Sequence, residues 1–298
     1  MMEQQIREFT DYLKNVKHTS DNTLVSYKRD LSRMAAYMES RGINDAADVT
    51  TDSLLDYAAS LNDEHFAASS ISRHNTSMKA FFRYMLENGN ISDNPAELLS
   101  SPRIEKNPPR ILNTVEVEDL LSQDFGSDAK GMRDRAIMEL MYATGLKTSE
   151  MIGLKLGNVD LSLSCIHMKR GGRNDGERLI PYGKKAKDAL NIYLTEGRNE
   201  LLSGMPDSDV LFLNCSGEPM SRQGLWKLVK TCVARAGIRS DITPFTLRHS
   251  FASHLVESGA DLSSVQEMMG YSDSNTISRY MNRKKRKDDP FEWARIRN

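Results

Sequence analysis

The stretch from residue 243 to residue 282 gathers side chains that could handle a phosphate ester. Arg248 and His249 stand near its start, and Tyr271 and Tyr280 stand towards its end. A guanidinium can hold two phosphate oxygens at once, and a tyrosine hydroxyl can attack phosphorus as a nucleophile. The same spacing also fits an ordinary amphipathic helix. These residues alone therefore leave two interpretations open.

The elements that would carry this stretch form the second part of the chain. The patterns of residues 130–156 predict two helices separated by a break at Gly145. Residues 164–183 contain two short apolar runs around a Gly-rich basic tip, which predicts a β-hairpin. Further helices are expected over residues 184–196, 222–237, 246–259 and 261–270. The fold class is mainly α with a small β-sheet or hairpin.

The first part of the chain has a different texture. Apolar residues at helical spacing predict helices over residues 20–43 and 69–90, with weaker ones over 3–16 and 51–62. We therefore expect a helical domain over residues 1–100. Prolines and scattered charge without periodicity predict an exposed linker over 101–113, so that residues 114–298 form the second domain.

Composition sets limits on the class of protein. The 298 residues are 39% hydrophobic and 27% charged, which is typical of a soluble globular protein with two domains. No run of about 18 apolar residues is present to span a membrane. The charged start is unlike a signal peptide, which favours a cytoplasmic protein.

Cysteine usage and charge narrow the chemistry further. Cys165, Cys215 and Cys232 are odd in number and lack CxxC spacing, so neither a disulfide framework nor a zinc site is expected. The formal net charge of −1 gives no attraction of the whole molecule to nucleic acid. Any DNA binding must come from local basic surfaces.

Several motifs occur in an order that resembles a known family. They are ATGLKTSEMIGLKLGNVDL, a basic hairpin ending ERLIPYG, then TPFTLRHSFASHLVESGADLSSVQEMMGYSD, and then Tyr280. This series resembles the catalytic domain of the tyrosine site-specific recombinases, or phage integrase family. The segments NTLVSYKRDL and SISRHNTSMKAFFRYM are similar to the SAM-like DNA-clamping domain of its Xer-type members.

The resemblance implies a two-domain, C-shaped clamp around duplex DNA, with four protomers gathering two sites. It implies that a tyrosine attacks the scissile phosphate and forms a 3′-phosphotyrosyl link, which a freed 5′-hydroxyl then reverses. Neither a metal nor another cofactor is implied, because the ester bond energy stays in the protein–DNA link. The implied partners are double-stranded DNA and other copies or relatives of the chain, with no membrane.

Some positions match the family and others depart from it. Tyr280 matches the nucleophile and Arg248 the second phosphate-binding arginine, while His249 fits a supporting hydrogen-bonding role. His254 is expected in the core.

Three positions carry substitutions. Lys147 stands where the first catalytic arginine is expected, and an ammonium cannot make two parallel bonds to a phosphate. Phe245 stands where a histidine base is expected and carries no proton. Tyr271 replaces a histidine or tryptophan and can still donate a hydrogen bond. Glu150 would orient the cation at position 147.

The hairpin leaves the proton donor for the leaving oxygen open. Counting back from ERLIP places the family's lysine near Arg173, with Lys169 and Arg170 close by. Lysine can serve as the acid, whereas arginine is a poor proton donor.

Basic residues of the first domain could line a DNA groove, although such a residue taken alone more often belongs to a solvated face. They are Lys28, Arg33, Arg73, Lys79 and Arg83. Two functions follow: a recombinase whose chemistry is impaired, or a non-catalytic DNA-binding and assembly subunit that partners an intact recombinase. A helical transcription regulator would not explain why the hairpin, Arg248 and Tyr280 occur together in order. Whether the chain is an active enzyme stays open at this point.

Overall fold

The structure of the chain is a computed structural model. It describes residues 1–102, 109–169, 176–202, 206, 208–238 and 241–271. It divides into two compact units, residues 1–107 and 108–298. Within the described residues, no helix combines the length and apolar character needed to cross a membrane.

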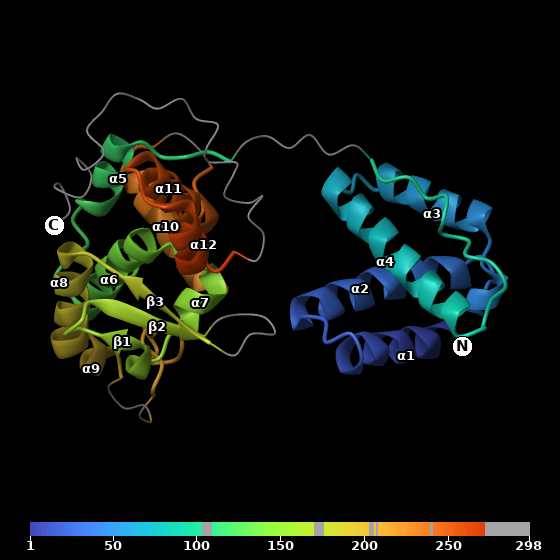
Figure 1. The fold of residues 1–298 in the computed structure, drawn as a ribbon, viewed down its shortest axis with the longest axis horizontal. Coiled ribbons are helices and arrows are strands. Elements are labelled where there is room, and N and C mark those ends of the chain that lie inside the picture. The colour runs from blue at the N-terminus through green and yellow to red at the C-terminus, as the bar shows by residue number, and fades with distance from the viewer. Residues whose placement is uncertain (103–108, 170–175, 203–205, 207, 239–240, 272–298) are drawn as a thin grey trace. The chain divides into compact units, whose positions relative to one another are not determined.

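The first unit is helical (Figure 1). Its helices are α1 (Met2–Asn15), α2 (Asp21–Glu39), α3 (Thr51–Asp63) and α4 (Ala68–Glu87), with a 3-10 turn at Ala46–Asp48. Helix α2 packs against α1, α3 and α4. Ser20 caps α2 by accepting a hydrogen bond from the amide of Thr23. The four helices predicted for this part of the chain are confirmed.

Apolar residues of all four helices, α1 to α4, build the core of the first unit. Phe9, Tyr57, Phe81 and Phe82 are almost completely buried. Phe9 meets Phe81 edge to face, with ring centroids 5.6 Å apart. The apolar residues at helical spacing in α4 therefore face this core.

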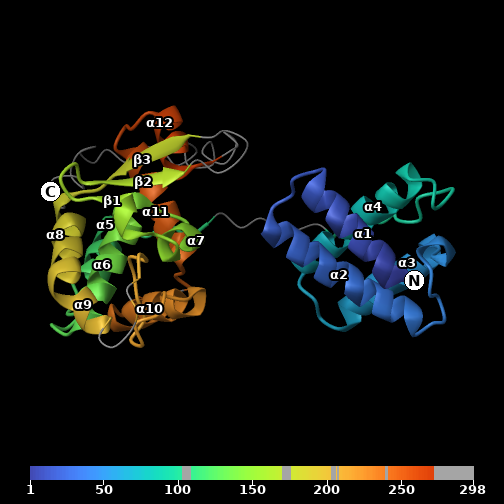
Figure 2. The ribbon, with the colours of Figure 1, turned by 90° about the horizontal axis from the view of Figure 1, so that it is seen from below.

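The second unit combines helices with one small sheet (Figures 1 and 2). Its helices are α5 (Thr114–Leu121), α6 (Ala129–Thr144), α7 (Thr148–Ile152), α8 (Lys184–Ile192), α9 (Arg198–Leu201), α10 (Arg222–Arg235), α11 (Pro244–Glu257) and α12 (Leu262–Met269). A 3-10 turn at Leu156–Asn158 and a π turn at Tyr193–Gly197 complete the helical elements. In Figure 2 the sheet and α12 lie at one side of the unit and α10 at the other, with α6 and α11 between them.

The sheet has three antiparallel strands in the order β1 (Val159–Asp160), β2 (Cys165–Lys169) and β3 (Glu177–Pro181). The predicted hairpin corresponds to β2 and β3, while β1 was not predicted because two residues cannot display an alternation. Ile166 pairs with Ile180 and both are buried, whereas Leu179 on the opposite face is 57% exposed. Side chains of β3 therefore alternate between the core and the solvent.

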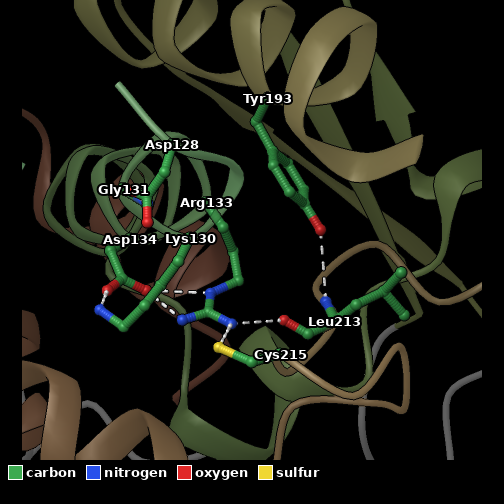
Figure 3. A network of polar contacts seen from close by, with 8 residues as sticks. All are labelled: Asp128, Lys130, Gly131, Arg133, Asp134, Tyr193, Leu213 and Cys215. Carbon is green, nitrogen blue, oxygen red and sulfur yellow. Dashed lines mark hydrogen bonds and ion pairs between the residues drawn. The ribbon is translucent and has the colours of Figure 1, made fainter. Parts of the chain in front are cut away.

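Helix α6 runs through the core of this unit and is buried on nearly all sides. Two of its buried charges are paired (Figure 3): Arg133 donates to Asp134 Oδ1 from Nε at 2.9 Å and from Nη2 at 2.6 Å. Arg133 Nη1 also donates to the carbonyl of Leu213 at 3.0 Å. Burial opposes the charged form, but the carboxylate of Asp134 outweighs it and raises the pKa of Arg133.

The predicted break between α6 and α7 is confirmed at Gly145. This residue has a φ of 58°, a left-handed conformation that favours glycine. A Cβ atom there would also lie 2.6 Å from Cδ1 of Phe251. The close approach of α11 therefore fixes where α6 ends and α7 begins.

Candidate active site

Helix α11 carries Phe245, Arg248 and His249. Thr243 and Thr246 form a reciprocal cap at its start, and Pro244 occupies the first helical position. Phe245 lies in the first turn and is 63% exposed. Arg248 and His249 follow three and four residues later, which places them on the same side of the helix as Phe245.

Arg248 is buried and joins two other elements to α11. Its Nη1 donates to the carbonyl of Gly145, which ends α6, and its Nη2 donates to the carbonyl of Met269 at 2.6 Å. The guanidinium carbon also lies 4.7 Å from the ring centroid of Tyr271. The turn before Lys147 and the end of α12 before Tyr271 are therefore held by one side chain.

The substituted residue at position 245 covers His249. The two rings meet edge to face with centroids 4.1 Å apart. Phe245 itself offers neither a donor nor an acceptor. A proton acceptor at this exposed position would have to come from another residue.

Lys147 precedes α7, and its side chain is half exposed. Its backbone N–H donates to Glu150 Oε2 at 2.8 Å, while its Nζ lies 3.9 Å from Glu150 Oε1. The ammonium is thus beside the carboxylate at the limit of an ion pair, without being enclosed by it. Position 147 keeps a positive charge at the surface near Arg248.

The structure adds Arg178 to this group, a residue that the sequence analysis did not single out. It lies on β3, is 3% exposed, and places Nη2 2.8 Å from Glu150 Oε1. A signal was present, because the two-residue period of a strand puts Arg178 on the same inward face as Ile180. A basic residue in a basic hairpin is easily taken for a solvated one.

Three other residues named from the sequence lie outside the described part of the chain: Arg170, Arg173 and Tyr280. Lys169 is described; it is exposed at the end of β2 and pairs in register with Glu177. His254 is buried, and its Nδ1 lies 2.9 Å from the hydroxyl of Tyr142.

The basic residues of the first unit lie on α2 and α4, but several are already engaged. Arg33 pairs with Glu64 and stacks over Phe66, and Arg83 pairs with Glu87 at 3.1 Å. Arg73 lies 3.2 Å from the buried Asp30. Lys28 is exposed and Lys79 half-buried. Three arginines of these two helices are thus oriented by carboxylates.

One group among the described residues could in principle hold a metal. The ligand atoms of Asp160, Cys165 and His167 lie within 4.8 Å of one another. Cys165 Sγ and His167 Nε2 are 3.7 Å apart and already satisfy each other as a weak hydrogen bond. By strand alternation these two side chains are on the face of the sheet opposite Arg178.

Comparison with known proteins decides the family. The family model described as "Phage integrase family" matches residues 110–287, and "Phage integrase, N-terminal SAM-like domain" matches residues 6–89. The chain belongs to the phage integrase family of tyrosine recombinases. Its fold class, with a SAM-like helical domain and a recombinase catalytic domain, is the one that the sequence predicts.

Relatives and solved structures agree with this membership. The chain is 38% identical to tyrosine recombinase XerD of Listeria monocytogenes over 280 residues, which cover 94% of each chain. It is 37% identical to XerD of Staphylococcus aureus over 279 residues, again covering 94% of both. A crystal structure of XerH site-specific recombinase bound to its difH substrate is similar in fold, with a TM-score of 0.71 and 21% identity. That match covers 95% of this chain and 82% of the other.

Proposed function

We propose that this chain is a site-specific recombinase-like protein that binds duplex DNA and has an impaired cleavage site. The observation that carries the proposal is the buried Arg248, which links the turn before Lys147 to the end of α12 before Tyr271. Positions 147, 248 and 271 are far apart in the sequence, and their convergence supports one phosphate-binding group.

The proposed chemistry follows from the residue types. The Tyr280 oxygen attacks phosphorus and forms the new P–O bond, while the bond to the 5′-oxygen breaks. Arg248 and Lys147 would hold the charge that builds on the non-bridging oxygens, and Tyr271 would donate one hydrogen bond. The proton of Tyr280 needs an acceptor, and the leaving oxygen needs a proton donor. Lys169 is the candidate donor, because the arginine at position 173 would be a poor one.

Two features support impairment. Phe245 occupies the first turn of α11 with an exposed apolar ring, so no base is provided there. Lys147 replaces a planar fork with a point charge, and loss of one preorganised donor typically costs on the order of 10² to 10³ in rate. We expect cleavage to be slow, and the exchange reaction to involve several copies of the chain on DNA.

A nicked suicide duplex tests the proposal. The duplex is built on the site that the native chain selects from a randomised DNA library, with the nick next to the cleavage point. The native chain should form little covalent adduct, and Phe245→His with Lys147→Arg should increase it about 10²-fold or more. Tyr280→Phe in that double variant should abolish the adduct. If no variant forms an adduct, the proposal that this site cleaves DNA is wrong.

The second candidate is a binding and assembly subunit that partners an intact recombinase. This candidate is favoured by Arg33 of α2 and Arg73 of α4, which carboxylates hold in place. DNA binding by these arginines would need no cleavage chemistry. The second candidate predicts unchanged recombination by the partner when this chain carries Tyr280→Phe. If that substitution stops strand exchange, the assembly function alone is insufficient.

A further inference from the structure

A buried arginine sits behind the exposed lysine of the site. Arg178 points inward from β3, and its side chain is 2% exposed. Guanidinium groups are rarely buried unless they are paired with an acid or with carbonyl groups. The group that pairs with Arg178 should therefore indicate the role of this side chain.

The pairing of Arg178 is incomplete. Nη2 lies 2.8 Å from Glu150 Oε1, but its N–H bonds are not directed at that oxygen. Among the described residues, neither Nε nor Nη2 reaches a hydrogen-bond acceptor. The contact with Glu150 is thus mainly one of charge, and it leaves donor capacity unused.

Glu150 is shared between two cations. Its Oε1 faces Arg178 at 2.8 Å and Lys147 Nζ at 3.9 Å, while its Oε2 accepts from the Lys147 amide. One carboxylate can neutralise one cation, and here the nearer cation is the buried arginine. Lys147, whose side chain is 48% exposed, therefore keeps its charge available to an incoming anion.

Arg178 also adjoins the end of α12. A Cβ at Gly270 would collide with Arg178 Nη1 and would lie 2.8 Å from Cζ. Gly270 precedes Tyr271, whose ring stacks with Arg248. The guanidinium thus lies between the carboxylate that borders Lys147 and the turn that presents Tyr271.

We propose that Arg178 is a positioning residue, which occupies Glu150 and so frees the Lys147 ammonium to contact a DNA phosphate. This proposal rests on the function proposed above only in taking DNA as the ligand. Without Arg178, the carboxylate of Glu150 would draw in Lys147 and cancel its charge. Removing both Arg178 and Glu150 would then return Lys147 to the phosphate.

The test measures DNA affinity against salt concentration with the library-selected duplex, so it does not depend on cleavage. Each lysine–phosphate contact contributes about 0.9 to the slope of log K against log salt. Arg178→Gln should reduce the magnitude of this slope by about 0.9, the contribution of one contact. Lys147→Gln should reduce it by the same amount. The double variant Arg178→Gln with Glu150→Gln should recover it, which a merely structural role would not allow.

A second buried pair supplies the matched control. Arg133→Gln removes a buried arginine from Asp134 in the same unit, and Arg133→Gln with Asp134→Asn removes both charges. Both should leave the slope unchanged. If Arg178→Gln alters the slope no more than these controls do, or if the double variant does not recover, the proposal is overturned.

If the native chain selects no DNA site, the proposed function fails, and the role of Arg178 is judged on the free protein. In that case, and also if Arg178→Gln does not fold, the test is ¹⁵N NMR of the free native chain and its Lys147→Gln variant with labelled arginine. The Nε signal of Arg178 should shift on Lys147→Gln, because the two residues share Glu150. An unchanged signal overturns the proposal.

Discussion

Two buried arginines of the second unit, Arg133 and Arg178, meet carboxylates in different ways. Arg133 is saturated, since Asp134 accepts from Nε and Nη2 while Nη1 donates to Leu213 and lies 3.7 Å from Cys215 Sγ. Arg178 has one carboxylate at ion-pair distance and two nitrogens without an acceptor among the described residues.

The difference matches what surrounds each pair. The second oxygen of Asp134 is engaged by Lys130 at 2.7 Å, so the network around Arg133 is closed (Figure 3). Glu150, by contrast, borders the half-exposed Lys147. A network in which every charged group is paired contributes to stability. A network with unused donors beside a candidate site can instead position a side chain of that site.

The largest expected effect is on stability at the saturated pair. Arg133→Gln leaves Asp134 buried with only Lys130 as a cationic partner, and breaking a buried pair costs about 3 to 5 kcal/mol. Urea unfolding should show this loss. Asp134→Asn added to Arg133→Gln should return part of it, and a loss below about 1 kcal/mol would show that the pair behaves like a surface one.

A buried network of the first unit extends the comparison to protonation. His74 Nδ1 lies 3.1 Å from the Tyr57 hydroxyl, and Nε2 lies 3.4 Å from Asp30 Oδ1. Burial, followed by the charges of Arg73, Arg33 and Arg29, lowers the pKa of His74 from 6.5 to about 4. The unfolded chain therefore binds more protons than the folded one between these values.

Stability of the first unit should thus fall as the pH drops from about 6.5 to about 4, by roughly 2 to 3 kcal/mol. Burial raises the pKa of Asp30, which works in the opposite direction at the acid end of this range. Hydrogen exchange of the α2 and α4 amides measures the change. His74→Gln should make the stability of the first unit less dependent on pH. If the pH dependence is unchanged in that variant, another group causes it.

A smaller stability loss is expected at the open pair. Arg178→Gln removes a contact that already lacks directed hydrogen bonds, and Lys147 can move towards Glu150 in its place. We expect a cost of about 1 to 2 kcal/mol in urea unfolding. A cost equal to that of Arg133→Gln would mean that the two pairs are equivalent and that the comparison is wrong.

Much of this arrangement follows from sequence patterns, and its limits have physical causes. Periodicity placed the long helices, and Gly145 marked the break that its left-handed backbone requires. The short strand β1 and helix α5 went unpredicted because two to eight residues carry little periodic signal. The link from Arg248 to Gly145 and Met269 depends on tertiary contacts that no local spacing encodes.

The site residues divide in the same way. Motif order indicated Arg248, Lys147 and Phe245, and the roles given to them stay predictions. The charge of Arg178 suggests an exposed side chain, whereas strand alternation sets it on the inward face with Ile180. A residue that acts through a carboxylate shared across elements becomes visible only when α7 and β3 are seen together.

The finest test compares two glycines with nearly the same backbone. Gly270 and Gly237 have φ values of 62° and 65°, so alanine at either meets the same left-handed penalty of about 1 to 2 kcal/mol. Among the described residues, a Cβ at Gly237 meets nothing within 4 Å, whereas one at Gly270 meets Arg178. Gly270→Ala should therefore cost about 1 kcal/mol more than Gly237→Ala in urea unfolding. Because Arg178→Gln shortens the side chain, the excess should disappear when Gly270→Ala is made in that variant. A persistent excess would place the strain on another neighbour of α12.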